Sequence, residues 1–353
     1  MLYRQSAPAS LALLMCALFI GCSTQTYKEV YPTLIDGRYD SEFPYRACSK
    51  QLEEITESVK MVSTIAYYRS YSFAVEDHVR LSDISPEFLS LHEKRAIFIN
   101  RSMSGTATII YGDERHVALL TCAHVVAFPD TTISWYLDQT GHRTPYIETY
   151  ALKERQMNFA GAVPEGGELD ILAIDTANDI VVLGKTFSVP LSFPLPVFHY
   201  PIGRASELEW GSFVYLFGYP SGYRMVTKAI VSDPNRDKRN SFLIDAVFGG
   251  GFSGGIALAI RDGVPNFELV GMVKLVSARS YYVVTPRRED GPIEYDPSVP
   301  YTGELFVDRK TDIEYGVSQA VSVEVIRDFI EKNRKTLSSR GYQISLFNPS
   351  KGN

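Results

Sequence analysis

The chain has 353 residues, 45% of them hydrophobic, which is enough for one large globular domain or two smaller ones. Its formal net charge is −6 and it has no cluster of Lys and Arg, so nucleic acid is not an expected partner. Four cysteines in this length are too few for a disulfide scaffold, so stability must come from a hydrophobic core. No pair of cysteines or histidines has metal-ligand spacing, and we expect no metal or other cofactor.

Residues 1–21 have the pattern of a signal peptide. Arg4 supplies a positive charge, and the apolar run Leu11–Ile20 is too short for a bilayer span, which takes about 20 residues. The segment Phe19–Cys22 resembles a bacterial lipobox, which implies cleavage before Cys22 and lipidation of its thiol. Ser23 resembles the sorting signal of outer-membrane lipoproteins, so the expected location is the bacterial cell envelope, lipid-anchored and facing the periplasm. The alternative is an ordinary signal peptide followed by a chance cysteine.

The next segments predict a tether and then an all-β domain. Residues 22–50 are rich in Thr, Tyr, Pro, Gly and Asp without apolar periodicity, and are interpreted as the tether. The segment Gln51–Val59 is compatible with a short helix, and Val62–Phe73 is a β-prone run, either the first strand of the domain or an N-terminal addition. From Ala96 onward, short runs rich in Val, Ile, Tyr and Phe alternate with turn clusters, which is typical of all-β domains. Only Glu324–Leu337 has helical spacing, so we predict one domain over 51–337 and a tail over 338–353.

Two long polar stretches interrupt this pattern. Residues 135–168 are interpreted as a surface excursion. Residues 277–314 follow the apolar strand Leu269–Val276, and are either a lid over a binding site or a surface loop without such a role.

Three short motifs indicate acyl-transfer chemistry. In Gly249–Gly255 five glycines surround Ser253, which favours a tight turn that presents the hydroxyl and leaves backbone N–H groups free. His124 follows an apolar strand, and Asp179 opens another. Each has an ordinary alternative: a glycine turn without function, a core histidine, and a turn residue or cap. All three alternatives would have to hold at once for the motifs to have no catalytic role. The order His, Asp, Ser along the chain is one of those that Ser-His-Asp triads use.

These motifs resemble those of the trypsin-like serine proteases. Thr121–His124 is similar to their T-A-A-H motif, Asn178–Leu183 to their D-I-A-L-L strand, and Gly251–Gly255 to G-x-S-G-G. Further segments are similar to the HtrA/DegP-like bacterial branch: Ser104–Ile110, Phe213–Gly222 and Tyr315–Ile330. The resemblance implies two six-stranded antiparallel β-barrels with a C-terminal helix. The chain stops soon after that helix, so we expect no PDZ domain of the kind that many HtrA relatives carry.

The resemblance also implies a role for each matching residue. Ser253 would be the nucleophile, His124 the general base and then acid, and Asp179 the carboxylate that orients the imidazole. The N–H groups of Gly251 and Ser253 would form the oxyanion hole. Phe252 departs from the usual Asp or Asn, and Cys122 from the usual small residue, but neither change removes a catalytic atom.

The substrate pocket is implied by position alone. Val247 and Phe248 would lie near its base and side, and Val276 on its wall. No acid stands at the base, so cleavage after Lys or Arg is not expected, and small or medium apolar residues are favoured before the cut.

The sequence therefore predicts a lipid-anchored serine endopeptidase that hydrolyses envelope proteins or peptides through an acyl-enzyme on Ser253. The alternative is a catalytically latent binding or scaffold protein on the same fold, because Phe252 or the 277–314 insertion could distort the oxyanion turn. An esterase is a third reading, but the G-x-S-x-G elbow belongs to α/β folds. Neither the natural substrate nor the oligomeric state follows from the sequence.

Overall fold

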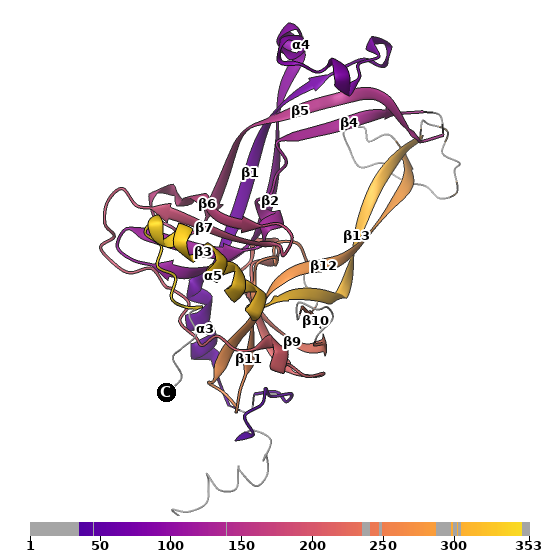
Figure 1. The fold of residues 1–353 in the computed structure, drawn as a ribbon. Coiled ribbons are helices and arrows are strands. Elements are labelled where there is room, and N and C mark those ends of the chain that lie inside the picture. The colour runs from indigo at the N-terminus through magenta and orange to yellow at the C-terminus, as the bar shows by residue number, and fades with distance from the viewer. Residues whose placement is uncertain are drawn as a thin grey trace, which may run out of the picture.

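A computed structural model describes residues 35–44, 46–138, 140–234, 241–246, 249–286, 298, 302 and 305–347. Antiparallel strands dominate these residues and form two closed barrels with a helix near the C-terminus, and two extensions project from the barrels (Figure 1). The predicted fold class, an all-β protein of two six-stranded barrels with a C-terminal helix, is confirmed. None of the described helices has the length and apolar character needed to cross a membrane.

The first barrel has the strand order β1-β2-β3-β7-β6-β5 and closes by pairing of β5 with β1. Its β3 and β7 are buried along nearly their whole length, as continuous apolar runs usually are. The strand β4 adds to the outer side of β5. The bounds are β1 (Val59–Ser72), β2 (Ala96–Gly112), β3 (His116–Thr121), β4 (Thr131–Leu137), β5 (Arg143–Ala160), β6 (Glu168–Asp175) and β7 (Ile180–Thr186).

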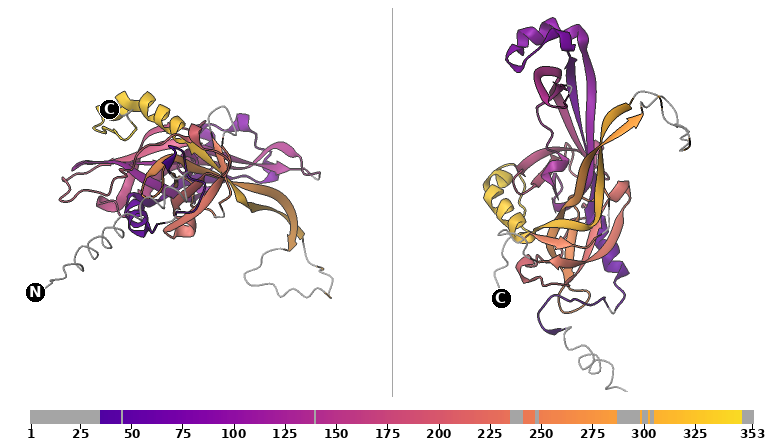
Figure 2. Two further views of the ribbon diagram at one scale, coloured as in Figure 1. Left: turned by 90° about the horizontal axis from the view of Figure 1, so that it is seen from below. Right: turned by 90° about the vertical axis from the view of Figure 1, so that its right-hand side faces the viewer.

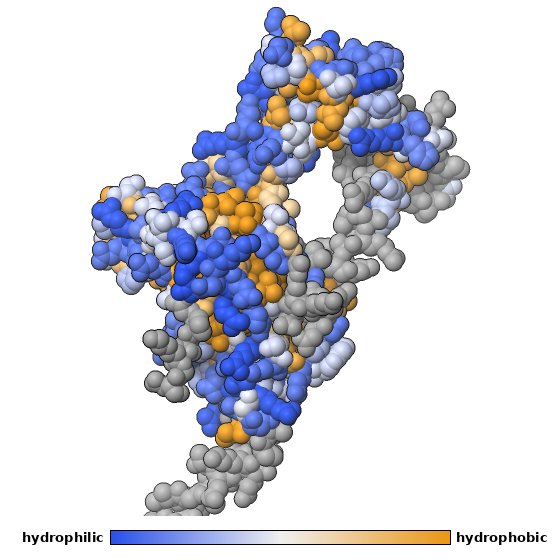
Figure 3. Space-filling view, in the orientation of Figure 1, coloured by the Kyte–Doolittle hydropathy of each residue, from blue (hydrophilic) through white to orange (hydrophobic). Residues whose placement is uncertain are grey.

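Three strands of this barrel are much longer than the barrel wall requires. Their outer parts continue with β4 as a four-stranded antiparallel sheet in the order β2-β1-β5-β4 (Figure 1). We call this sheet, with the segment that joins β1 to β2, the arm (residues 66–104 and 131–156). The joining segment contains α4 (Pro86–Leu91) and the short turns η2 (Val75–Asp77), η3 (Leu81–Asp83) and η4 (Glu93–Arg95). Figure 3 shows apolar surface toward the end of the arm.

The arm changes the interpretation of residues 135–168. They do leave the barrel, but as paired strands rather than as an irregular loop, because β5 pairs with β1 from Ser72↔Thr149 to Val62↔Ala160. The side chains of β5 alternate between buried, half-buried and exposed. A sheet that faces water on one side has such a mixed sequence, which explains why the sequence of this stretch predicts a surface excursion.

The second barrel closes in the order β10-β13-β12-β11-β8-β9. Beyond the barrel β12 and β13 continue as a two-stranded ribbon, paired from Ala278↔Ile313 to Pro286↔Leu305, which projects from the body (Figure 2). The described part of the 277–314 insertion is therefore this ribbon. The bounds are β8 (Phe213–Gly218), β9 (Met225–Asp233), β10 (Phe242–Ile244), β11 (Ile256–Ile260), β12 (Phe267–Pro286) and β13 (Leu305–Ser322).

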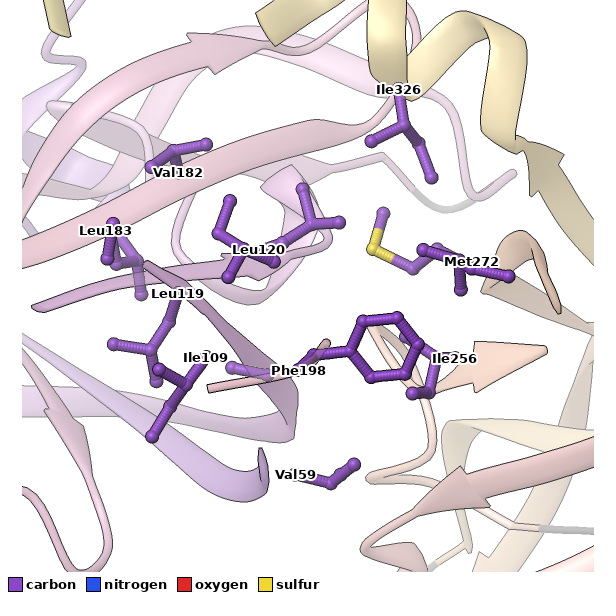
Figure 4. Close-up of a cluster of buried hydrophobic side chains, with 14 of the residues drawn as sticks. Val59, Ile109, Leu119, Leu120, Val182, Leu183, Phe198, Ile256, Met272 and Ile326 are labelled. Atoms are coloured by element: carbon purple, nitrogen blue, oxygen red, sulfur yellow. The ribbon is translucent and has the colours of Figure 1, made fainter. Parts of the chain in front are cut away.

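One hydrophobic cluster joins the two barrels and the C-terminal helix. Leu120 and Val182 of the first barrel, Met272 of the second and Ile326 of the helix belong to it, and all are buried (Figure 4). The helix is α5 (Val323–Ser339), close to the predicted range. The two barrels and α5 therefore share one continuous hydrophobic core.

The segments at the two ends of the described chain pack against the barrels. The β-prone run after the predicted short helix is indeed the first barrel strand, β1, and the helix itself is α3 (Ser49–Ser58). Within the predicted tether, Tyr39 is buried and bridges to Arg261 of the second barrel. In the predicted tail, Tyr342 and Phe347 are buried in the joint cluster. The domain boundaries themselves stay predictions.

Candidate active site

His124 and Asp179 meet at one end of the first barrel. His124 lies in the short turn η5 (Ala123–Val125) that follows β3, and Asp179 immediately precedes β7. The carboxylate of Asp179 accepts two hydrogen bonds, from the His124 backbone N–H to Oδ1 (2.8 Å) and from Nδ1 to Oδ2 (2.7 Å). Asp179 is 8% exposed, whereas the imidazole is 37% exposed. The carboxylate thus fixes the ring from the buried side, and Nε2 remains as the nitrogen that can take up a proton.

The turn before β7 explains how Asp179 comes to face the histidine. The side chain of Asp175 accepts hydrogen bonds from the N–H groups of Ala177 and Asn178, which closes a tight turn. Asp179 then has a φ of +60°, in the left-handed region that Asp tolerates better than most residues. Its carbonyl accepts from the Ala123 N–H (3.2 Å), so the turn is tied to the histidine segment by backbone as well.

Ser253 lies in a turn that only glycines allow. Gly251 and Gly254 have φ values of +99° and +89°. A Cβ on Gly254 would overlap the Thr106 carbonyl oxygen and the Thr121 hydroxyl, and one on Gly251 would lie 2.6 Å from the Tyr219 carbonyl oxygen. Gly251 and Gly254 therefore allow close packing of the turn between the two barrels.

Phe252 anchors the turn from below. Its side chain is fully buried in the core of the second barrel, where it packs against Gly218 and Gly255. A Cβ on Gly218 would lie 3.1 Å from the Phe252 ring, and one on Gly255 would lie 2.9 Å from it. The ring thus fills a space that the two glycines leave open, and this packing gives no support to the interpretation that Phe252 distorts the turn.

The turn presents two backbone N–H groups that have no acceptor among the described residues. The Gly250 carbonyl accepts from the Ser221 N–H (2.9 Å), and because a trans peptide points its C=O and N–H in opposite directions, the Gly251 N–H points away from Ser221. In the described parts of the chain neither the Gly251 nor the Ser253 N–H has a hydrogen-bond acceptor. Unpaired donors of this kind are what an oxyanion site needs.

Thr106 of β2 connects the turn to both barrels. Its N–H donates to the Ser253 carbonyl (2.8 Å), and its hydroxyl donates to the Gly251 carbonyl (2.8 Å). The same hydroxyl accepts from the Tyr219 N–H (2.8 Å), and its carbonyl accepts from the Thr121 hydroxyl (2.6 Å). One side chain and its backbone therefore fix the carbonyl groups on both sides of Phe252.

The Ser253 hydroxyl is directed toward β12. It donates to the Lys274 carbonyl oxygen at 3.4 Å, and no hydrogen bond joins it to His124 in the described structure. The two segments are nevertheless neighbours, because a Cβ on Gly105 would lie 2.7 Å from the Val125 side chain and 2.9 Å from the Ser253 carbonyl oxygen. A change of the Ser253 rotamer would be required to direct Oγ to Nε2. Such bonds are commonly loose before substrate is present.

Cys122 lies directly behind the pair. Its thiol is fully buried and donates to the Val273 carbonyl (3.3 Å), and burial, together with the nearby charge of Asp179, raises the pKa of the thiol well above its usual value. The ligand atoms of Cys122, His124 and Asp179 lie within 4.8 Å of one another, which is the only group of described residues close enough to hold a metal ion. The thiol stays protonated, and His124 and Asp179 are hydrogen-bonded to each other. Cys122 therefore packs as a buried neutral side chain beside that pair.

The residues predicted for the substrate pocket are not tested. Val247 and Phe248 lie outside the described residues. The backbone of Val276 belongs to β12 and pairs with Ser318. Sequence reasoning missed the roles of Thr106 and Ser221. Thr106 falls within the segment that resembles the HtrA-like strand, but its contacts depend on how the second barrel packs against the first.

Part of the chain is similar to a known protein family. Residues 105–272, a little under half of the chain, match the trypsin-like peptidase domain family. Among solved structures, the crystal structure of Deg5 is similar, with 19% identity, a TM-score of 0.37, and coverage of 64% of this chain and 83% of that one. No curated protein matches the chain.

Proposed function

We propose that the protein is a serine endopeptidase with Ser253 as its nucleophile. The observation that carries the proposal is the hydrogen-bonded pair of His124 and Asp179 beside a glycine turn that holds Ser253 and two unused N–H donors. The peptidase-family match covers all three residues.

Each group has a defined part in the reaction. Nε2 of His124 takes the proton of the Ser253 hydroxyl as Oγ bonds to the carbonyl carbon of the scissile peptide. The N–H groups of Gly251 and Ser253 hold the oxygen that becomes negative, and removing one such donor typically costs about 10²–10³ in rate. His124 then gives its proton to the leaving amine, the C–N bond breaks, and water releases the acyl group by the same steps in reverse order. Asp179 holds the imidazole in one tautomer and stabilises its charged form.

The latent scaffold alternative predicts a serine that does not react. It draws on the direction of the Ser253 hydroxyl, toward Lys274 rather than His124. Catalytic hydrogen bonds are commonly loose or absent before substrate is present, so this observation alone does not favour the alternative.

The activity is tested with a fluorophosphonate probe, which reacts only with an activated serine. The wild-type protein should be labelled, and Ser253→Ala should abolish labelling. Ser188→Ala, which removes an exposed hydroxyl bonded to Glu165, is the matched control and should be labelled like the wild type. Absence of labelling of the folded wild-type protein would support the scaffold reading instead.

We further propose that the mature chain is lipid-anchored through Cys22 in the bacterial envelope, where it would act on proteins or peptides. Cys22 lies outside the described residues, and the proposal is supported by the lipobox-like segment. Expression in a bacterial host with labelled palmitate should yield a labelled, membrane-associated protein. Cys22→Ala should be unlabelled and move to the soluble fraction, and an unchanged distribution would refute the anchor.

A further inference from the structure

The strand that holds the nucleophile turn has a long unpaired edge. Within the arm β2 pairs on one side only, with β1, from Tyr71↔Ala96 onward. Its other side meets β3 first at Thr108↔Leu120, inside the barrel. The segment Ala96–Ser104 is thus the outer edge of the arm, and most of its side chains are exposed.

The orientation of the backbone groups along this edge follows from Thr106. Its N–H and C=O point away from β1, toward Ser253 and Thr121. The register between β1 and β2 has no irregularity, so residues two, four, six and eight positions earlier have the same orientation. The outward residues are therefore Phe98, Asn100, Ser102 and Ser104.

These outward groups are available for binding. In the described parts of the chain, none of their N–H or C=O groups has a hydrogen-bond partner. Natural proteins usually protect such an edge with Pro, Lys or a bulge. The sequence of Ala96–Ser104 has neither Pro nor Lys, and its only charged residue is Arg101. The edge is thus long, regular and unprotected.

The free edge leads directly to Ser253. The nucleophile turn lies between two strands, because the Ser253 carbonyl accepts from Thr106 of β2 while the Gly254 N–H donates to Val273 of β12. Val276 of β12 is predicted to lie on the wall of the pocket for the residue before the cut, so in the proposed reaction the residues before the cut would lie on the side of β12. The residues after the cut therefore leave on the side of β2, away from the serine and toward the end of the arm.

We propose that the free edge of β2 over Ala96–Ser104 binds the part of an extended, unfolded polypeptide that follows the scissile bond, as an added strand. This inference rests on the proposed function. The bound segment would run from Ser253 toward the end of the arm, and β2 runs in the opposite direction, so the pairing is antiparallel. Up to about eight backbone hydrogen bonds are available, and because every residue carries the same groups, recognition would depend on extension rather than on sequence.

The first experiment varies substrate length. A cleavage site is found in reduced casein by mass spectrometry, and two quenched fluorescent peptides are made with the same residues before the cut and either two or ten residues after it. The longer peptide should have a kcat/KM about tenfold higher or more, since a few net hydrogen bonds are enough for this factor. Equal values for the two peptides would overturn the inference.

The second experiment tests the backbone pattern on the wild-type protein. N-methyl groups placed one at a time along the segment after the cut should lower kcat/KM at every second position and leave it unchanged at the positions between, because alternate N–H groups of an added strand face β2. A uniform effect, or none beyond the second position, would contradict strand addition.

The third experiment changes the edge itself. Asn100→Pro removes an outward N–H without touching the bonds to β1, and should lose the length-dependent gain, whereas Asn100→Ala keeps the N–H and should retain the gain. Thermal unfolding checks that the arm is intact, and the N-methyl series decides the question if the proline variant does not fold. A gain retained in a folded Asn100→Pro refutes the proposal. The proposal is also refuted if the wild-type protein is a dimer and Asn100→Pro is a monomer, because a second copy of the chain then occupies the edge.

The outcomes separate this inference from the proposed function. If the protein neither reacts with the fluorophosphonate probe nor cleaves any peptide, the peptidase proposal fails. If it cleaves both peptides equally well, the peptidase proposal stands and only the binding role of the free edge is wrong.

Discussion

Two threonines on β2, two positions apart, differ completely in what their hydroxyl groups do. The Thr106 hydroxyl donates to Gly251 and accepts from Tyr219, while the buried Thr108 hydroxyl has no hydrogen-bond partner among the residues that the structure describes. Replacing either with Val keeps the shape of the side chain. Comparing the two Val variants therefore distinguishes a role of Thr106 in positioning the nucleophile turn from a general effect of the substitution on β2.

We predict that Thr106→Val lowers kcat about tenfold or more with little change in KM, because the Gly251 carbonyl loses the hydrogen bond from Thr106 that helps to orient the nucleophile turn. It should also lower the free energy of unfolding by about 1–3 kcal/mol, since the Tyr219 N–H loses its acceptor. Thr108→Val should leave kcat unchanged and maintain or raise stability. Steady-state kinetics and urea unfolding of both variants give the answer, and equal losses in the two would contradict a positioning role.

Asp40 makes stability depend on pH. Burial, reinforced by the charges of Glu42, Asp262 and Asp36, raises the pKa of its carboxyl group to about 6, although the Gly263 N–H bonded to it acts in the opposite sense. Its Oδ1 is buried without a hydrogen-bond partner in the described part of the chain. Because this pKa is above that of the unfolded chain, the folded state binds the proton more tightly. The contribution to stability is therefore complete at about pH 4 and is lost as the pH rises through about 6.

Asp40→Asn should raise the midpoint of thermal unfolding at pH 7.5, by an amount on the order of 2 kcal/mol in free energy, because it removes a buried charge. The same variant should show little advantage at pH 3.5, where the wild-type carboxyl is protonated in the folded state and mostly protonated in the unfolded chain. Calorimetry at both pH values measures the difference. An advantage of equal size at the two pH values would show that the charge is not the cause.

At the scale of elements, the turn Gly249–Gly255 combines positions that tolerate a side chain with positions that do not. A Cβ on Gly249 would meet no atom within 4 Å, whereas one on Gly254 would overlap Thr106 and Thr121. Gly254 also has a positive φ. Position within the turn, and not glycine content as such, decides the effect of a substitution.

Gly254→Ala should therefore abolish labelling by the fluorophosphonate probe and destabilise the protein by more than about 1 kcal/mol, because the backbone must move to make room. Gly249→Ala is its matched control and should be labelled like the wild type. A labelled, stable Gly254→Ala protein would mean that the turn is less constrained than its contacts indicate.

The elements that could be predicted from the sequence are those whose signal is local. The strands before His124 and after Asp179 are continuous apolar runs, and α5 has clear helical spacing. The arm could not be predicted, because the half-exposed β5 has the composition of a surface loop. Likewise, the burial of Tyr39 depends on Arg261 and Glu268, more than 200 residues away in the chain. The hydroxyl contacts of Thr106 are equally non-local.

For the whole molecule, the shared core between the barrels has a thermodynamic consequence. Met272 is fully buried in the cluster that both barrels and α5 form. The two barrels should therefore unfold together, in one cooperative transition.

Met272→Ala should lower the free energy of unfolding by about 2–5 kcal/mol and shift that single transition to lower temperature. Val284→Ala, on the exposed part of the ribbon, should change it by less than about 0.5 kcal/mol. Differential scanning calorimetry distinguishes the cases, and two separate transitions in either protein would show that the barrels unfold independently.

Because the register between β1 and β2 is unbroken, the length of the arm sets the length of the free edge. From Ala96 to Ser104 the edge measures about 26 Å, at about 3.3 Å for each residue step. Residues inserted at the far end, between β1 and β2, would lengthen the free edge without changing the orientation of the backbone groups that is fixed at Thr106. A single residue inserted near Ser104 would instead move the side chains of Ala96–Met103 to the opposite face of the sheet. Length variation in this hairpin should therefore be accommodated at its far end and not near the barrel.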